Sequence, residues 1–242
     1  MIKILTGGGF GDAAMSIGKL YSKHAPFNVE LDKIHLTHVE VPGDLLSIIR
    51  KFYITQGINI EVKQIPSWGW RDLNRDKFDF YLGTHWPKYN VGDETTWEIN
   101  PFPPLKYNLI DDVETVVSIG GGRKGSPYPR QYSIDEIEYI DNNLSNVIFT
   151  GTTTDQKYID YTYKNISLIN KTTIPEFIDY ICSCKNFIGH LGFPLILAAM
   201  AKKVCFSPKP TQNPAHGFGG WSYRIHPEWN VTEIVNVRDI KL

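Results

Sequence analysis

The feature that most constrains this chain is a short apolar run that ends in glycines and leads toward a helix, because the chain contains it twice. In the first copy, Ile2 to Leu5 precedes Gly7-Gly8-Gly9 and a helical pattern over Ala13 to Ser22. In the second copy, Val113 to Ile119 precedes Gly120-Gly121-Gly122. A buried strand that turns through glycines into a helix is typical of a βαβ unit with parallel strands. The copies lie about 115 residues apart, so each one begins a separate sheet.

The rest of each half continues the alternation of strands and helices. Further strands are predicted at Ile34–Val39, Ile58–Val62, Phe78–Leu82, Asn146–Phe149, Ile166–Ile169, Asn186–Gly189 and, as the last strand, Val204–Ser207. Helices are predicted after Pro42-Gly43-Asp44, from Ser133 onward, over Pro175–Cys184 and over Phe193–Ala201. This alternation predicts an α/β protein with two Rossmann-like domains, residues 1–110 and 111–242. The proline-rich segment from Trp86 to Pro104 is interpreted as a linker or a lid.

Composition narrows the class of protein. Hydrophobic side chains make up 42% of the 242 residues, enough for a substantial core. No window approaches about eighteen uninterrupted apolar residues, and Met1 to Gly9 lack the basic start of a secretory signal, so we expect no transmembrane segment and a cytoplasmic location. Cys182, Cys184 and Cys205 are expected to be reduced core thiols. The net charge of -1 does not favour a polyanionic partner such as DNA.

The first glycine loop supports more than one chemical interpretation. Gly9 to Ala14 fits the G-x-G-x-x-A fingerprint, with Glu30 and Asp32 about twenty residues later, which is typical of an NAD(P)-dependent oxidoreductase. Asp12 argues against a dinucleotide, because its carboxylate would face the pyrophosphate. An aspartate at the carboxyl end of a strand can instead accept a proton from a substrate hydroxyl. It can also simply cap its helix, which its residue type alone favours.

The second glycine loop and a later turn are candidate anion sites. Gly120-Gly121-Gly122 runs into Arg123 and Lys124, so main-chain amides and cations form a cradle for an anion, or else a surface turn with solvated charges. Gly189-His190-Leu191-Gly192-Phe193 leads into an apolar helix whose first amides can receive a diphosphate. His190 is equally well an ordinary loop histidine bonded to the main chain.

Three segments follow the motifs of one enzyme family. Gly9-Phe10-Gly11-Asp12 is similar to an amino-terminal G-x-G-D loop whose aspartate is the proposed base. Gly120 to Lys124, with Tyr128-Pro129 in place of a W-P pair, is similar to a donor loop. Phe187 to Met200 is similar to the donor-diphosphate segment D-[ST]-G-x-x-H-x-x-A-A. In these motifs the chain resembles glycosyltransferases of the two-Rossmann-domain (GT-B) type, and among them the heptosyltransferase-like group related to ADP-heptose:LPS heptosyltransferases.

The third segment departs from the family pattern at two positions. Counted back from Ala198-Ala199, the family's aspartate falls on His190 and its histidine on Leu195, whereas Gly192 matches. Neither of those two side chains carries over. Further on, Pro208 to Pro214 is loosely similar to the family's G-P-T-x-P loop.

The resemblance implies a small version of the GT-B fold, in which two domains face each other across a cleft. It implies an inverting, metal-independent glycosyltransferase without a cofactor, with Asp12 as the base. The donor, a nucleotide-diphosphate sugar, is expected in residues 111–242, on Gly120, Gly121, Gly122, Arg123, Lys124, Thr150, Gly151, His190, Gly192 and Phe193. Of these, Thr150 and Gly151 follow a strand and either contact the base or ribose of the donor or simply end that strand. The acceptor is expected in residues 1–110, on Gly9, Phe10, Gly11 and Trp86. Trp86 is one of several aromatic residues that either stack on the acceptor or form the core of a lid: Trp68, Trp70, Trp86, Tyr89 and Trp97.

The acceptor and the activity have alternatives. A glycan hydroxyl is the acceptor that the resemblance implies, whereas a viral-type enzyme would use a hydroxymethylated DNA base. The altered donor segment is also compatible with a catalytically silent module that binds nucleotide sugars, and the first glycine loop leaves the oxidoreductase as a further class.

Overall fold

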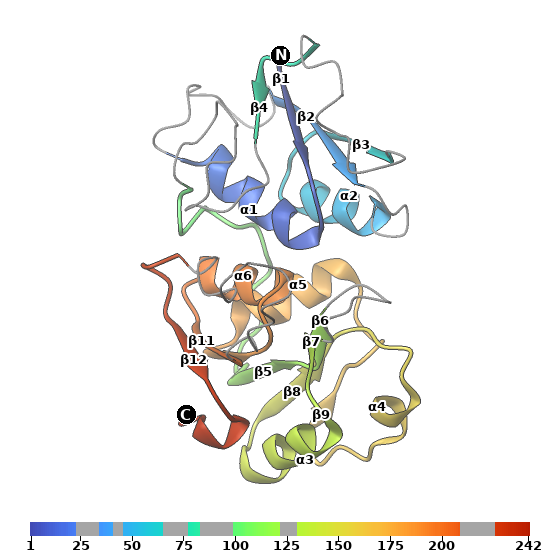
Figure 1. Cartoon of the computed structure of the whole chain (residues 1–242), viewed down its shortest axis with the longest axis vertical. Helices are drawn as coiled ribbons and strands as arrows, with labels where there is room; N and C mark the ends of the chain where they lie inside the picture. The colour runs from blue at the N-terminus through green and yellow to red at the C-terminus, as the bar shows by residue number, and fades with distance from the viewer. Residues whose placement is uncertain (23–33, 41–45, 65–76, 83–98, 122–129, 209–225) are drawn as a thin grey trace, which may run out of the picture. The chain divides into compact units, whose positions relative to one another are not determined.

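The computed structural model describes residues 1–22, 34–40, 46–64, 77–82, 99–121, 130–208 and 226–242. The chain divides into two compact units, Met1–Tyr107 and Asn108–Leu242, here called unit 1 and unit 2 (Figure 1). The division therefore falls between residues 107 and 108, whereas the sequence prediction placed it between 110 and 111. The main sheet of each unit is parallel and packs against helices, which confirms the predicted α/β class.

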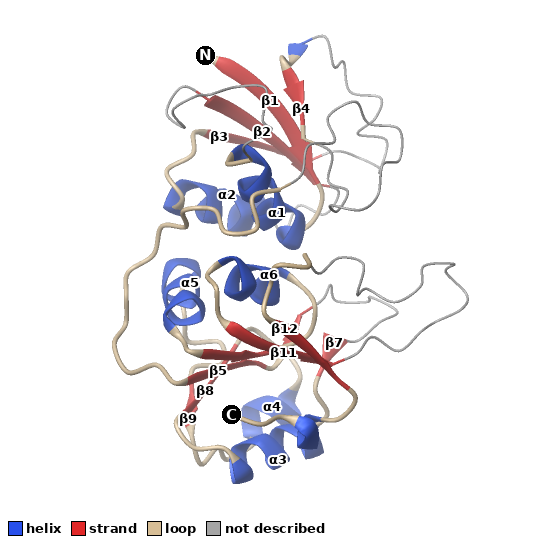
Figure 2. Ribbon diagram, turned by 90° about the vertical axis from the view of Figure 1, so that its left-hand side faces the viewer, coloured by secondary structure: helices blue, strands red, loops and turns tan. Residues whose placement is uncertain are grey.

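Unit 1 is a four-stranded sheet with helices on one side. Its elements are β1 (Ile2–Gly7), α1 (Phe10–Leu20), β2 (Ile34–Glu40), α2 (Leu46–Thr55), β3 (Ile60–Gln64) and β4 (Phe80–Tyr81). The strands pair in parallel in the order β3-β2-β1-β4. Helices α1 and α2 lie on the same side of the sheet (Figure 2). Their buried side chains include Ile17 and Phe52, which form the core with Ile4 of β1.

Unit 2 is a six-stranded sheet with helices on both faces. Its elements are β5 (Thr115–Ser118), β6 (Gly120–Gly121), β7 (Arg130–Gln131), α3 (Ile134–Asn143), β8 (Val147–Thr150), α4 (Gln156–Asp160), β9 (Ile166–Ser167), α5 (Ile174–Ser183), β10 (Asn186–Ile188), α6 (Phe193–Met200), β11 (Val204–Pro208), β12 (Val231–Ile234) and the 3-10 helix η7 (Val237–Asp239). The order of the parallel strands is β12-β11-β10-β5-β8-β9. Helices α5 and α6 lie on one face, and α3 and α4 on the other (Figure 2).

Helix capping explains where two helices begin. Ser133 caps α3, with its hydroxyl oxygen accepting from Glu136 N at 3.2 Å and Glu136 Oε2 accepting from Ser133 N at 2.7 Å. The prediction of a helix from Ser133 is thereby confirmed. Helix α1 begins at Phe10, so the prediction that this helix begins at Ala13 is wrong. The earlier start is stabilised by a hydrogen bond from Gly9 N to Asp12 Oδ2 at 2.8 Å. This contact brings Phe10, Gly11 and Asp12, which were expected in the glycine loop, into the first turn of the helix.

Two predictions about strands are wrong. Val204–Ser207 is not the last strand, because β12 pairs with β11 from Val231 to Ile234. This edge strand is short and exposes Thr232 and Glu233, so it lacks a clear apolar run. Gly120 and Gly121 do not form an open turn: they pair antiparallel with Gln131 and Arg130 as strands β6 and β7. That pairing depends on residues about ten positions later, which a local pattern does not reveal.

The cysteines behave as expected from the sequence. Cys182, Cys184 and Cys205 are free and buried, and their burial raises the pKa of all three thiols. They are therefore protonated core side chains at neutral pH. In the part of the chain that the structure describes, no helix combines the length and apolar character needed to cross a membrane.

The connection between the units is anchored at each end within its own unit. In unit 1, Gln56 Nε2 donates to the carbonyl oxygen of Lys106 at 2.9 Å, and Lys106 N donates to Gln56 Oε1 at 2.8 Å. In unit 2, Asn108 N and Nδ2 donate to the two carboxylate oxygens of Asp179 at 2.8 and 3.0 Å. Tyr107 lies between these two anchors, so the change from one unit to the other is confined to a short stretch of chain.

A buried carboxylate, Asp141, ties α3 to the segment before β9. It accepts hydrogen bonds from Lys164 N at 2.7 Å, Asn165 N at 3.0 Å and Asn165 Nδ2 at 2.9 Å. Desolvation raises the pKa of Asp141, but the hydrogen bonds from Lys164 and Asn165 outweigh it and hold the pKa below its usual value.

Asp141→Asn is expected to destabilise unit 2 by about 1 to 3 kcal/mol near neutral pH, because the amide leaves buried N–H donors without an acceptor. In the wild type this stabilisation is fully present above the unfolded-state pKa of about 3.9 and is lost as pH falls through the lower folded-state pKa. Urea unfolding measured from about pH 7 down to about pH 2 checks this. The gap between the two proteins should narrow below about pH 4. A gap that does not depend on pH would contradict a role for the carboxylate charge.

Candidate functional site

Unit 2 has the strand order with which open α/β sheets bind ligands. From β5 the chain builds outward through β8 and β9, and it then returns to place β10, β11 and β12 on the other side. The order thus reverses between β5 and β10. In such sheets ligands bind beyond the carboxyl ends of the strands at this point. The residues that follow β5, β8 and β10 are therefore the candidate site of unit 2.

Glycines bring these three strand ends together. A Cβ on Gly189, after β10, would lie 2.7 Å from Phe187 Cε1 and 3.4 Å from Ser118 Cβ on β5. Gly151, after β8, has a φ of +124°, and a Cβ there would lie 3.4 Å from Ile119 Cγ1 and 3.9 Å from the Gly120 carbonyl oxygen. Gly120 and Gly151, both predicted site residues, are thus close to each other, and main chain forms this part of the site.

The turn after β10 carries the remaining predicted residues of this site. Gly192 is the N-cap of α6 and has no side chain to occupy the first-turn amides. His190 is half-buried, and its ring centroid lies 4.6 Å from that of Tyr132. Tyr132, which is fully buried, was missed by the sequence analysis because its contact with His190 joins segments far apart in the chain.

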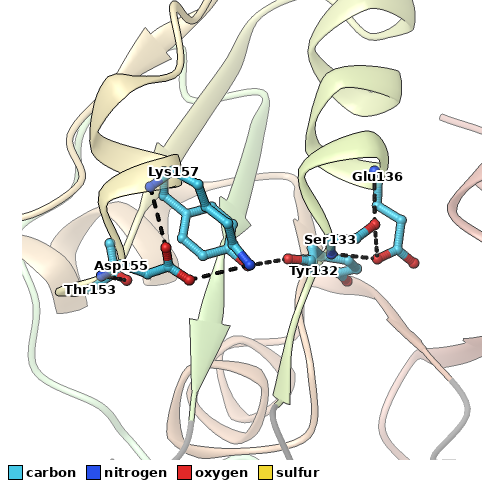
Figure 3. A network of polar contacts seen from close by, with 7 residues as sticks. Tyr132, Ser133, Glu136, Thr153, Asp155 and Lys157 are labelled. Atoms are coloured by element: carbon cyan, nitrogen blue, oxygen red, sulfur yellow. Dashed lines mark hydrogen bonds and ion pairs between the residues drawn. The ribbon is translucent and has the colours of Figure 1, made fainter.

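The predicted basic loop is anchored at both of its ends. Gly122, Arg123 and Lys124 lie outside the described residues, so their positions stay predictions. The loop leaves from β6 and re-enters at β7, which precedes Tyr132. The re-entry point is held by the Tyr158 hydroxyl of α4, which donates to the Tyr132 carbonyl oxygen. Tyr132 lies next to the Ser133 cap of α3 (Figure 3). The ends of the basic loop are therefore fixed beside β5.

Lys157 and Asp155 complete this support on the side of α4. Lys157 Nζ lies 3.2 Å from Asp155 Oδ2 and 4.8 Å from the Tyr158 ring centroid (Figure 3). The hydrogen bond with Asp155 is the main cause that raises the pKa of Lys157. Both side chains are half-exposed, so this pair is a modest support for α4 and not a buried charge pair.

Two predicted donor residues turn their side chains into the core. Thr150 is fully buried at the end of β8, and Phe193 is buried and stacks on Phe177 with ring centroids 6.5 Å apart. Leu195, where the family has histidine, is also buried. Side-chain contacts from these positions to a ligand are not supported. At Phe193 the main-chain amide in the first turn of α6 is the group that faces outward from the helix end.

Unit 1 presents Asp12 at the carboxyl end of β1. Gly8 has a φ of +108°, and a Cβ there would lie 2.6 Å from Asp12 Oδ2. Together with the Gly9 N–H bond at 2.8 Å, this close approach fixes the half-buried carboxylate against the glycine turn. Glycine is required at position 8 because of the positive φ and because a Cβ would overlap the Asp12 carboxylate.

The other acceptor-side residues divide into two groups. Phe10 and Gly11 are half-buried in the first turn of α1, and the Phe10 ring packs edge-on against Phe52 at 5.7 Å. Trp86 lies outside the described residues, as do the other predicted aromatic residues Trp68, Trp70, Tyr89 and Trp97. Among the residues with described positions, no group of three or more His, Cys, Asp or Glu side chains is arranged to hold a metal ion.

Comparison with known proteins identifies the fold. No protein-family model matches the chain, and no curated protein matches it. E. coli ADP-heptose lps heptosyltransferase II matches with a TM-score of 0.59 and 11% identity over 97% of this chain and 90% of that chain. The glycosyl transferase family 9 protein from Veillonella parvula matches with a TM-score of 0.58 and 11% identity, over 96% of this chain and 86% of that chain. E. coli heptosyltransferase WaaC with ADP matches with a TM-score of 0.51 and 9% identity, over 88% of this chain and 89% of that chain. The resemblance drawn from the motifs is thus confirmed at the level of the fold.

Gly8→Ala tests whether the glycine turn positions Asp12, and Gly57→Ala is its matched control. Both glycines have positive φ, so each substitution is expected to cost about 1 kcal/mol or more of stability through backbone strain. At Gly57 the new Cβ meets the flexible end of Lys106, whereas at Gly8 it meets the Asp12 carboxylate. In the transfer assay proposed below, only Gly8→Ala should lose turnover beyond its loss of stability. Equal losses in both variants would remove Gly8 from the site.

Proposed function

We propose that this protein is an inverting glycosyltransferase that moves a sugar from a nucleotide-diphosphate donor to an acceptor hydroxyl. The observation that carries the proposal is the convergence of three glycine-lined strand ends beside the amino-terminal end of α6, at the reversal of strand order in unit 2. A nucleotide diphosphate fits such an edge, because main chain approaches it closely and helix amides face its charge.

The donor diphosphate is proposed to lie between α6 and the basic loop. The first amides of α6 would donate to its oxygens, while Arg123 and Lys124 would neutralise the charge that grows as the sugar–oxygen bond breaks. Gly120, Gly121, Gly122 and Gly151 would allow the nucleotide to approach the main chain. Two of the structures that share the fold hold ADP and ADP-2-deoxy-2-fluoro heptose, so ADP-sugars are the first donors to test.

Asp12 is proposed to be the general base for an acceptor bound by unit 1. Its carboxylate would take the proton as the acceptor oxygen attacks the anomeric carbon on the face opposite the departing diphosphate, which inverts the configuration. Transfer requires the two units to present donor and acceptor to each other across a cleft, as the GT-B resemblance implies. Gly9, Phe10, Gly11 and Trp86 would surround the acceptor.

The same geometry argues against the oxidoreductase. In a dinucleotide site the amides at the start of α1 would bind the pyrophosphate, but here Asp12 Oδ2 already accepts from Gly9 N. A bound pyrophosphate would therefore face a carboxylate. A silent binding module would retain donor affinity without turnover, so an assay for transfer and donor hydrolysis separates it from the enzyme.

The proposal needs neither a cofactor nor a metal ion. The cations of the basic loop and the helix amides would stabilise the leaving diphosphate in place of a divalent ion. We infer a glycan acceptor, since the solved structures with this fold include a lps heptosyltransferase, whereas nothing in the chain's charge or in those structures favours DNA.

Lys124→Ala is expected to weaken donor binding by about 1.5 to 3 kcal/mol if Lys124 makes a charge-assisted bond to a phosphate oxygen. The matched control is Lys185→Ala. Lys185 precedes β10 and pairs with Glu114 at 2.7 Å, so it lies at the amino ends of the strands, away from the proposed site. Calorimetric titration with ADP measures both variants. Wild-type affinity in Lys124→Ala would exclude this lysine from the donor site.

Asp12→Asn separates a base from a cap. Asparagine retains an oxygen that can accept from Gly9 N but cannot take the acceptor's proton. Turnover is expected to fall about a hundredfold or more, with melting temperature and donor affinity nearly unchanged. The measurement is steady-state transfer from an ADP-sugar, followed beside thermal unfolding. Near-normal turnover in a folded Asn variant would leave Asp12 with the capping role alone.

A further inference from the structure

Beneath Asp12, three hydroxyl side chains lie buried in an otherwise apolar core. They are Thr6 on β1, Ser16 on α1 and Tyr53 on α2, and each is exposed by 1% or less. Their neighbours in the core include Ile4, Ile17 and Phe52. A valine, alanine or phenylalanine would fill the same spaces without the cost of burying a polar group, which is about 1 to 3 kcal/mol when it is not fully compensated.

Ser16 is the centre of this hydroxyl cluster. Its Oγ–H donates to the main-chain carbonyl oxygen of Asp12 at 2.9 Å. Ser16 Oγ also lies 2.8 Å from Thr6 Oγ1. Ser16 therefore links Thr6 on β1 to the first turn of α1 through two hydrogen bonds.

Tyr53 on α2 is the third buried hydroxyl, and both Ser16 and Asp12 affect its pKa. Burial is the main cause that raises the pKa of the Tyr53 hydroxyl, hydrogen bonding with Ser16 opposes this shift, and the negative charge of Asp12 adds to it. Tyr53 is therefore neutral at physiological pH and lies within electrostatic range of the carboxylate. Its ring is held by Phe52, with centroids 5.6 Å apart.

We propose that Ser16, with Thr6 and Tyr53, positions Asp12 for catalysis by fixing the first turn of α1 to β1 and α2. The inference rests on the proposed function, in which Asp12 is the base. The carboxylate is held by Gly9 on one side, and the carbonyl of the same residue is held by Ser16 on the other. Two fixed points on one residue restrict its rotation, and a base must lie within hydrogen-bond reach of the proton that it takes.

The test removes each hydroxyl with little change of shape. Tyr53→Phe and Thr6→Val keep the packing, and Ser16→Ala removes the central group. Thr115→Val is the matched control: Thr115 is fully buried on β5 of unit 2, and its hydroxyl has no hydrogen-bond partner among the residues with described positions. Thermal unfolding first establishes that each variant is folded. If Ser16→Ala does not fold, the two shape-preserving variants decide the test.

Two measurements are made on each folded variant. In steady-state transfer from an ADP-sugar, kcat is expected to fall about tenfold in the cluster variants with KM for both substrates little changed, because the base is misplaced while binding is intact. In carbon-13 NMR of the carboxylates, with Asp12 assigned by comparison with Asp12→Asn, the Asp12 titration midpoint is expected to move to higher pH. The charged form loses stabilisation when its surroundings become less polar or its contact with Gly9 loosens. Thr115→Val should change neither quantity.

The outcomes separate the inference from the proposed function. Wild-type kcat and an unchanged Asp12 midpoint in all folded cluster variants would overturn the positioning role. A loss of kcat that Thr115→Val shares to the same extent would overturn it too, because the effect would then follow from any buried hydroxyl. If the wild type transfers no sugar, the proposed function fails, and the NMR midpoints alone still decide whether the cluster positions Asp12.

Discussion

The return of the chain across the sheet of unit 2 is the constraint on which the candidate donor site depends. Parallel pairing forces each connection to cross over a face of the sheet, and the right-handed crossover determines which face. After β9, α5 leads the chain back to pair β10 with β5 on the side opposite β8, which places α5 and α6 on one face and α3 on the other (Figure 2). The connections after β5 and β10 therefore leave in opposite directions. Between them the strand ends are covered by glycines, and main-chain groups are available to a ligand.

Both units carry a strand, a glycine turn and a helix, but they fill the start of that helix differently. In unit 1 the chain supplies its own anion, since Asp12 accepts from Gly9 N in the first turn of α1. In unit 2 Gly192 begins α6 without any side chain at the cap. A helix start favours negative charge, so a diphosphate competes with a carboxylate in unit 1 and meets no such competitor from the cap in unit 2. This difference is why we propose that the donor binds unit 2 and the acceptor binds unit 1.

Features with a local physical cause could be predicted from the sequence. The Ser133 cap, the buried cysteines and the central strand β5 depend on neighbouring residues or on apolar runs, and the structure has them. The start of α1 was misplaced, because a single hydrogen bond between Gly9 and Asp12 decides it. Strand β12 was missed because its stability comes from pairing with β11 and not from its own composition.

The candidate site shows the same division. Gly120, Gly151 and Gly192 were identified from glycine turns after strands, a signal that is present in the sequence. Tyr132 and the hydroxyl cluster under Asp12 were not, because Tyr132 reaches His190 and Tyr53 reaches Ser16 across different elements. No spacing rule predicts contacts of this kind, since they depend on how α1, α2 and the strands pack.

In the proposed donor complex, the departures from the family motif would change how the diphosphate is held. Where the family has a histidine, Leu195 is buried in α6, and where it has an aspartate, His190 lies against Tyr132. In the proposed complex the turn after β10 therefore contributes main-chain amides and an imidazole that becomes a cation on protonation, and no carboxylate. The binding of a doubly charged diphosphate would depend on those amides and on Arg123 and Lys124. Because cations near the surface are screened by salt whereas helix amides at close range are screened much less, donor affinity in this protein should fall with ionic strength by an amount that reports the share carried by the basic loop.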